Sequence, residues 1–348
     1  MVSLIKRALH RVAWRLEKLV DRLAVRRNAR RMIEPYLGYA TPEHLIVRGR
    51  VLTSLRRSQP KPTQSKWTNF KQMLALFFTA EVSGVEVAAE GVTAVSDAEG
   101  YFTILLPRGA QTGVTDITVT IPDQTTQAIC PVFVADPNAA FIVISDIDDT
   151  MLQTGAYSLV KNLWTSLTGN INTRNIFPDS VDLMTALSKG GQNPIYYVSS
   201  SPWNLFHFLL SIFERSGLVR GPMFLRDLGI SEQQFIAGSH GDHKGASIDV
   251  ILAAHPDLNA ILVGDTGQHD AFVYRDAIER HPGRIMAVVL REPGPGPDEE
   301  SRHTMELIAA AGIPLLHAPT FDGFADQLDN LVVQTNGRST EPSVDART

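Results

Sequence analysis

A continuous apolar run that ends in three carboxylates constrains this chain more than any other feature. Residues Phe141–Ile144 are apolar, and Ser145-Asp146-Ile147-Asp148-Asp149-Thr150 follow them directly. The apolar run predicts a strand that is buried on both faces of a parallel sheet. Carboxylates this close together repel one another and are hard to keep ionised without a cation. The sequence therefore predicts a site for a hard divalent cation at the end of this strand, with Mg²⁺ as the best candidate.

The spacing of the carboxylates also indicates chemistry. On an extended backbone, Asp146 and Asp148 point to the same side of the strand. One carboxylate is then placed to attack a substrate while the other transfers protons.

Length, charge and cysteine content limit the class of protein. The 348 residues suffice for two domains, each with its own apolar core. The single cysteine, Cys130, excludes an internal disulfide and fits a reducing compartment, so we expect a cytoplasmic protein. No apolar run is long enough to span a membrane, and the N-terminus lacks the pattern of a signal peptide. The sequence carries no signal for an oligomeric state.

The charge is distributed unevenly along the chain. Residues 1–34 hold ten of the 32 basic residues and three of the 37 acidic ones, which leaves the remainder at a net charge of −12. Apolar residues recur there at three- and four-residue spacing, which predicts a basic amphipathic helix. Such a helix suits an anionic membrane surface, where it would give peripheral association. Packing of the helix on its own domain or on a partner protein is the alternative.

Residues 35–138 are predicted to form a small β-sandwich-like accessory domain, because short strand patterns alternate with turn signals. Ser96–Gly100 is one such turn. The expected strands are Leu45–Leu52, Val85–Val87, Val92–Val95, Tyr101–Leu106, Asp116–Ile121 and Ala128–Val134.

Residues 139–334 alternate between strand and helix patterns, which predicts an α/β domain with a doubly wound parallel sheet. The residues from 335 to 348 are polar and are predicted to be a disordered tail. The strands expected after the first, which begins at Phe141, are Pro194–Ser199, Pro222–Arg226, Ala260–Asp265, Ile285–Arg291 and Pro314–Ala318. Ligands of such sheets bind at the carboxyl ends of the strands.

Polar residues gather at those strand ends or in the loops that follow. Ser199 and Ser200 end the second strand, Lys244 lies in a loop, and Asp265 ends a later strand, with Asp270 five residues on. Each motif alone is ordinary turn, cap or surface chemistry. Their order along the chain, from Asp-x-Asp-x-Thr through Ser and Lys to Gly-Asp, gives the set its weight. A receiver domain places its lysine last, whereas Lys244 precedes Asp265, so we exclude that class.

This order resembles the haloacid dehalogenase superfamily of aspartyl-phosphate phosphatases. Three segments, Ser145–Thr150, Tyr197–Trp203 and Gly264–Asp270, look more specifically like the actin-patch phosphatidate phosphatase catalytic domain family, which is related to lipins. The resemblance covers roughly Phe141 to Leu331. The run of three serines before Pro202 departs from the Asn-Ser-Pro-Trp form of that family.

The resemblance implies a hydrolase that forms an aspartyl phosphate. Asp146 would be the nucleophile and Asp148 the general acid and base. Ser199 would hydrogen-bond a phosphoryl oxygen, and Lys244 would offset the developing negative charge.

The remaining implied roles concern the metal and the substrate. Mg²⁺ would be held by Asp146, the backbone carbonyl of Asp148, and Asp265, while Asp270 would hold a metal-bound water or orient Lys244. Thr150, Ser200 and His269 are further candidates for substrate binding.

The leading interpretation is a Mg²⁺-dependent phosphatidate phosphatase that releases diacylglycerol, with a phospholipid substrate and no nucleic-acid partner. The segment between the first two motifs, about Met151 to Asn193, is too short for a large cap. We expect it to form either a small cap over the site or a segment whose apolar residues pack on the core. Two alternatives stay open. One is a phosphatase for a soluble phosphomonoester or a phosphoprotein. The other is a non-enzymatic membrane adaptor that senses phosphatidate.

Overall fold

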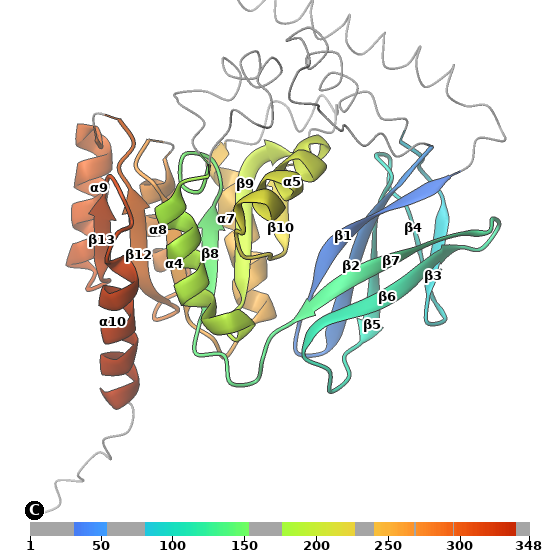
Figure 1. Cartoon of the computed structure of the whole chain (residues 1–348), viewed down its shortest axis with the longest axis horizontal. Helices are drawn as coiled ribbons and strands as arrows, with labels where there is room; N and C mark the ends of the chain where they lie inside the picture. The colour runs from blue at the N-terminus through green and yellow to red at the C-terminus, as the bar shows by residue number, and fades with distance from the viewer. Residues whose placement is uncertain are drawn as a thin grey trace, which may run out of the picture.

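The computed structural model describes residues 31–53, 81–152, 176–226, 240–267, 269–294 and 296–338 (Figure 1). The predicted basic helix lies almost wholly outside the described residues, as do the central part of the predicted cap and the last ten residues. The first described strand, β1 (Met32–Ala40), begins inside the segment 1–34, so that segment is not helical at its end.

The N-terminal half of the described chain is a seven-stranded sheet with the order β4-β3-β6-β7-β1-β2-β5. Within this sheet, β1 and β7 pair in parallel and the other neighbouring strands pair antiparallel. β1 is the one strand that the sequence did not predict. The other strands are β2 (His44–Leu52), β3 (Glu86–Ala89), β4 (Val92–Val95), β5 (Tyr101–Pro107), β6 (Gly113–Ile121) and β7 (Thr126–Val134).

The hydrogen-bonded strands form one sheet and not the two sheets of the predicted sandwich. The sheet curves until its end strands β4 and β5 contact each other. Strand β5 shows how the core is built, because Phe102, Ile104 and Leu106 point inward while Thr103 and Leu105 are exposed. A closed apolar interior is thus obtained from a single sheet.

The C-terminal half contains a six-stranded parallel sheet with the order β10-β9-β8-β11-β12-β13. All six predicted strands are present. The order reverses between β8 and β11, so these neighbouring strands flank the switch point at which open α/β sheets bind ligands. Their bounds are β8 (Ile142–Asp146), β9 (Ile195–Pro202), β10 (Met223–Arg226), β11 (Ala260–Asp265), β12 (Ile285–Arg291) and β13 (Leu315–Ala318).

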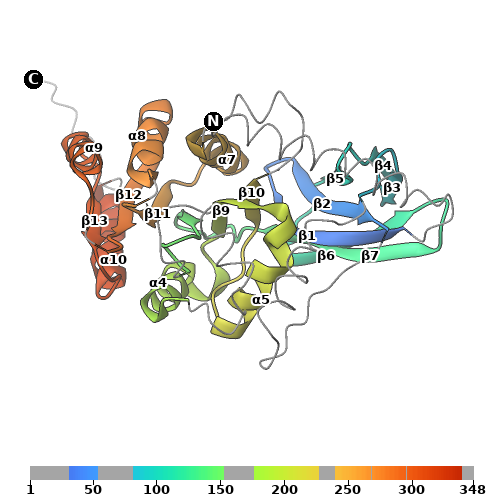
Figure 2. The ribbon, with the colours of Figure 1, turned by 90° about the horizontal axis from the view of Figure 1, so that it is seen from above.

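Helices cover both faces of this sheet (Figure 2). Val143 packs with α4 (Pro178–Ser188), α5 (Phe206–Ser216) and α10 (Phe324–Arg338). The next residue, Ile144, packs with α7 (His240–Ala254), α8 (Asp270–Arg280) and α9 (Glu299–Ala310) on the other face. The alternation explains why the strands are apolar throughout. Helix α10 extends to Arg338, four residues into the segment predicted to be disordered.

The two sheets share their cores. Tyr36 of β1 belongs to the core cluster under α4 and α5, and Tyr39 belongs to the cluster on the opposite face. At the edge of this contact, Glu34 Oε1 lies 2.6 Å from His207 Nε2 of α5. The accessory sheet is therefore fixed to the α/β domain through buried and polar contacts.

The Glu34–His207 pair makes this contact sensitive to acid. Burial raises the pKa of Glu34, but the hydrogen bond and charge of His207, with Tyr36 and Arg50, bring it below its ordinary value of 4.5. A carboxyl whose pKa is lowered by folding stabilises the protein above its unfolded pKa, and this stabilisation is lost as the pH falls through the folded value. We expect Glu34→Gln to lower the unfolding free energy by about 1–2 kcal/mol at pH 7 and by close to zero at about pH 3. Urea unfolding at both pH values measures the two differences, and equal differences would contradict the assignment.

Candidate active site

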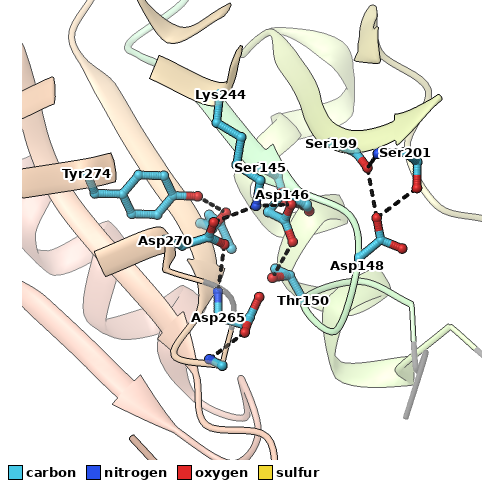
Figure 3. Close-up of polar contacts among 12 residues, drawn as sticks. Ser145, Asp146, Asp148, Thr150, Ser199, Ser201, Lys244, Asp265, Asp270 and Tyr274 are labelled. Atoms are coloured by element: carbon cyan, nitrogen blue, oxygen red, sulfur yellow. Dashed lines mark hydrogen bonds and ion pairs between the residues drawn. The ribbon is translucent and has the colours of Figure 1, made fainter. Parts of the chain in front are cut away.

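Three buried carboxylates meet at the switch point of the parallel sheet (Figure 3). Asp146 ends β8, Asp265 ends the adjacent β11, and Asp270 begins α8. One oxygen of each lies within 4.8 Å of the others. Asp265 and Asp270 have no exposed surface, and Asp146 is 2% exposed. The fold therefore brings together three of the four residues that the resemblance implied as metal ligands, and their role as ligands stays a prediction.

Lys244 lies in α7 and not in the loop that the sequence had suggested, and it links two of these carboxylates. Its Nζ lies 2.6 Å from Asp146 Oδ1 and 2.5 Å from Asp270 Oδ1, and the residue is 5% exposed. The other oxygen of Asp270, Oδ2, accepts a hydrogen bond from the backbone N–H of Asp265 at 3.1 Å. Asp270 thus contacts Lys244, in keeping with one of the two roles that the resemblance implied for it, and also fixes the start of the loop after β11.

The electrostatics of the cluster favour binding of a cation. Burial raises the pKa of Asp146 well above its usual range, Lys244 opposes this, and the neighbouring carboxylates add to it. Burial and the charges of Asp270 and Asp146 raise the pKa of Asp265 in the same way. Burial lowers the pKa of Lys244, but the two carboxylates outweigh burial and raise it overall. With every group ionised, three carboxylates face one ammonium group, and a further cation would balance the surplus negative charge.

The donor set fits Mg²⁺. Among the described residues, Asp265 Oδ2 is a buried oxygen that has no hydrogen-bond partner. A buried anionic oxygen without a partner is costly, and a metal ion removes that cost. The set consists of carboxylate oxygens alone, which are the ligands of hard divalent cations.

The turn after β8 aims Asp146. Thr150 Oγ1 donates a hydrogen bond to Asp146 Oδ2 at 3.1 Å. Asp149 has the left-handed backbone angle φ 57°, which aspartate tolerates better than most residues. This geometry lets the chain return, so that the N–H groups of Met151 and Leu152 donate to Ile147 O. Thr150 contacts the predicted nucleophile, whereas the sequence suggested contact with substrate.

Asp148 has different partners from Asp146. Its Oδ2 accepts hydrogen bonds from Ser199 Oγ at 2.8 Å and from Ser201 Oγ at 3.0 Å. Figure 3 shows Asp146 turned toward Lys244 and Asp148 turned toward the two serines. The expectation that both carboxylates project from one side of a strand was therefore wrong, because β8 ends at Asp146 and Asp148 lies in the turn.

The serines of β9 pair with Asp148. Ser199 donates its hydroxyl proton to Asp148 Oδ2 and accepts the backbone N–H of Ser201 at 2.9 Å, and its predicted contact with a phosphoryl oxygen stays a prediction. Ser201 was missed, although the two-residue period of a strand places it on the same side as Ser199. Ser200 lies between them and is half-buried.

His269 precedes α8 as its N-cap residue and is exposed, with the left-handed angle φ 67°. Its ring centroid lies 5.6 Å from that of Phe272. Its predicted contact with substrate stays a prediction.

Arg291, at the end of β12, holds the turn after β8 in place through hydrogen bonds. No sequence pattern identified it as a residue of the site. Its guanidinium donates to Thr150 O at 3.0 Å, to Pro319 O at 3.0 Å and to Asp179 Oδ2 at 2.8 Å. It lies between the rings of Phe177 and Phe321, at 4.0 and 4.1 Å from their centroids. One buried side chain thus connects the turn after β8, the first turn of α4 and the loop after β13.

We expect Arg291→Lys to lower the unfolding free energy by about 2–4 kcal/mol and to reduce turnover, because lysine cannot reproduce the planar fork of donors. Thermal unfolding and phosphate release measure the two effects. The control is Arg302→Lys, an exposed arginine whose Nε donates to Pro297 O at 3.2 Å, for which we expect a change within about 0.5 kcal/mol. Equal stability of the two variants would contradict the role of Arg291.

Gly264 leaves room for the cluster. A Cβ at this position would lie 2.6 Å from Asp270 Oδ2 and 2.7 Å from Tyr274 Oη. We expect Gly264→Ala to cost about 1–3 kcal/mol of stability and to weaken divalent-cation binding, because Asp270 must move. Calorimetric titration with Mg²⁺ and thermal unfolding test this expectation, which unchanged affinity and stability would refute.

Part of the α/β domain is similar to a known protein family. Residues 141–292 match the family model described as the catalytic domain of phosphatidate phosphatase APP1. The match runs from the start of β8 to just past β12 and includes each carboxylate, serine and lysine described above. Over this segment the chain is similar to the catalytic domain of phosphatidate phosphatase APP1.

Two curated relatives match the same part of the chain. Phosphatidate phosphatase APP1 of Saccharomyces cerevisiae is 30% identical over 158 residues, which is 43% of this chain and 25% of that protein. An uncharacterized protein of Schizosaccharomyces pombe is 27% identical over 154 residues, with the same coverage of each chain. The chain therefore spans about a quarter of the length of these relatives.

Among solved structures, a point mutant of the PilB minor pilin from Streptococcus sanguinis is 11% identical with a TM-score of 0.29, covering 76% of this chain and 91% of that one. Similarity at this level supports no conclusion about fold. Within the part of the chain that the structure describes, no helix has the length and apolar character that crossing a membrane requires.

Proposed function

We propose that this protein is a Mg²⁺-dependent phosphatidate phosphatase of haloacid dehalogenase-like fold, which acts through an aspartyl-phosphate intermediate. The proposal rests on the different surroundings of two carboxylates. Asp146 lies in a buried carboxylate cluster with Lys244, whereas the nearby Asp148 accepts hydrogen bonds from Ser199 and Ser201. Two carboxylates with different surroundings suit two different roles. The family of residues 141–292 supplies the substrate class.

In the first half of the reaction, an oxygen of Asp146 attacks the phosphorus of the phosphomonoester. An Asp146–phosphorus bond forms, and the bond from phosphorus to the glycerol oxygen breaks. Protonated Asp148 gives its proton to the leaving alkoxide, so that diacylglycerol departs as a neutral alcohol. The hydroxyls of Ser199 and Ser201 hold the carboxyl group of Asp148 in place.

In the second half, the Asp148 carboxylate takes a proton from water, whose oxygen attacks phosphorus and releases phosphate from Asp146. Lys244 keeps Asp146 oriented and offsets negative charge on the transferring group. Asp146, Asp265 and Asp270 would hold Mg²⁺, with the backbone carbonyl of Asp148 as a further predicted ligand. When bound, the ion supplies positive charge against the phosphoryl oxygens.

The lipid substrate and the basic N-terminal segment fit one another. Ten basic residues within residues 1–34 suit an anionic surface that contains phosphatidate. We propose that this segment places the α/β domain, residues 139–334, at such a surface in the cytoplasm, with the accessory β domain of residues 35–138 between them.

The direct test measures phosphate release from phosphatidate in mixed micelles, with Mg²⁺ and with a chelator. We expect turnover that needs the metal and rises with the surface concentration of phosphatidate. Efficient hydrolysis of water-soluble phosphomonoesters with indifference to micelles would contradict the lipid substrate. Tight binding to phosphatidate vesicles without turnover would contradict the enzymatic proposal.

A further inference from the structure

Strand β1 of the accessory sheet contacts the α/β domain beside the serines that hold Asp148. The ring of Tyr36 stacks on the indole of Trp203, with centroids 4.5 Å apart and planes at 25°. Trp203 begins the short helix η3 (Trp203–Leu205), directly after β9 ends at Pro202. The stack is thus one residue beyond the strand end that carries Ser199 and Ser201.

The same strand also holds the segment that follows. Tyr36 contacts Phe206 edge-on at 4.7 Å, and its hydroxyl donates to Glu34 Oε2 at 2.7 Å. Glu34 Oε1 in turn lies 2.6 Å from His207 Nε2. Tyr36 and Glu34 of β1 therefore contact Trp203, Phe206 and His207. These contacts hold both sides of the turn that leads from β9 into α5.

A third contact fixes the neighbouring strand β10. The Arg48 guanidinium of β2 donates to Met223 O at 3.2 Å and to Leu37 O at 2.8 Å. It also lies over the rings of Phe224 and Tyr39, at 4.8 and 5.2 Å from their centroids. The accessory sheet thereby contacts both strands at the β9–β10 edge of the parallel sheet.

We infer that the accessory β domain is a positioning element of the active site, in which Tyr36 acts through Trp203 to set the position of Ser199 and Ser201 and hence of Asp148. This inference rests on the proposed function in one respect, the role of Asp148 in proton transfer. A hydroxyl–carboxylate contact of 2.8 Å depends on the exact course of β9. Misplacement of a catalytic group by about 1 Å reduces turnover on the order of 10²-fold, so an aromatic support two residues after Ser201 matters.

The test uses the full chain with Tyr36→Leu, which fills most of the volume but removes the stack. Tyr36→Phe keeps the ring and loses only the hydroxyl. Ile46→Ala is the matched control, because Ile46 lies in the shared core on the other face of the parallel sheet. Trp203→Phe changes the other partner of the same stack, on the α/β domain. It takes the place of Tyr36→Leu if that variant does not fold.

The first readout is kinetic, at a temperature at which every variant is folded. For Tyr36→Leu we expect kcat for phosphatidate to fall by about 10- to 100-fold while KM changes by less than about threefold. We expect Tyr36→Phe and Ile46→Ala to keep kcat within about threefold of the parent. Equal losses of kcat in Tyr36→Leu and Ile46→Ala would overturn the inference.

The second readout does not depend on activity. The backbone N–H of Ser201 donates to Ser199 Oγ, so its hydrogen exchange reports the geometry of the serine pair. We expect exchange at Ser201 to accelerate at least about tenfold in Tyr36→Leu and to stay near the parent rate in Ile46→Ala. Unchanged exchange in Tyr36→Leu would overturn the inference even where no phosphatidate is hydrolysed. Accelerated exchange in a protein without turnover would uphold the coupling and reject the proposed function alone.

Discussion

Asp146→Asn is expected to lower kcat for phosphatidate by about 10⁴-fold or more, because an amide oxygen cannot form the acyl-phosphate bond. The variant should still fold, since asparagine has the same shape as aspartate. It also removes one negative charge from a cluster in which burial and neighbouring carboxylates already disfavour ionisation. Steady-state phosphate release and thermal unfolding, measured on the same preparation, separate lost chemistry from lost structure.

Asp149→Asn is the matched control for this substitution. Asp149 is the third carboxylate of the segment Asp146–Thr150, and asparagine also tolerates its left-handed backbone. We expect activity within about threefold of the parent. Substantial turnover in Asp146→Asn, or an equal loss in Asp149→Asn, would show that the nucleophile is another group.

Lys244→Met is expected to have the largest effect on stability. The substitution leaves Asp146 and Asp270 buried without their ammonium partner. Removing one partner of a buried ion pair costs about 3–5 kcal/mol, so the metal-free unfolding free energy should fall by this amount. Turnover should also fall, by on the order of 10²-fold or more, because a positioned charge on the transferring group is lost.

The metal dependence of this variant sharpens the test. If Mg²⁺ binds as proposed, it compensates the same carboxylates, so saturating Mg²⁺ should raise the unfolding temperature of Lys244→Met more than that of the parent. The control is Lys189→Met, whose amine pairs with Asp329 at 3.2 Å with both side chains well exposed. That pair should contribute less than about 1 kcal/mol. A Lys244→Met protein as stable as Lys189→Met, or one that Mg²⁺ does not stabilise, would contradict the charge account of the cluster.

Sequence patterns located the cluster because its members sit at predictable places. Asp146 and Asp265 each end an apolar strand, and the carboxyl ends of parallel strands share one edge. The pattern cannot say which oxygen contacts which donor. The partners of Ser199 and Thr150 therefore emerged only from the turn that follows β8.

Other features depend on residues far apart in the chain. Arg291 finds its partners at Thr150, Asp179 and Pro319, which no local pattern connects. The stack of Tyr36 on Trp203 likewise joins two domains. The short strand patterns of the accessory domain were predicted, but their pairing into one curved sheet depends on the parallel contact between β1 and β7.

The central claim is a phosphoryl group bound covalently to Asp146, and mass spectrometry of the quenched enzyme tests it most directly. The full chain, mixed with phosphatidate micelles and Mg²⁺ and quenched in acid within the first turnovers, should carry the intermediate, because Asp146 is phosphorylated before water attacks. We expect the mass increase of one phosphoryl group on the peptide that contains Asp146, and its absence when Asp146 is replaced by asparagine. Phosphorylation of Ser199 or Ser201 instead, or steady turnover with no labelled Asp146 peptide, would contradict the account.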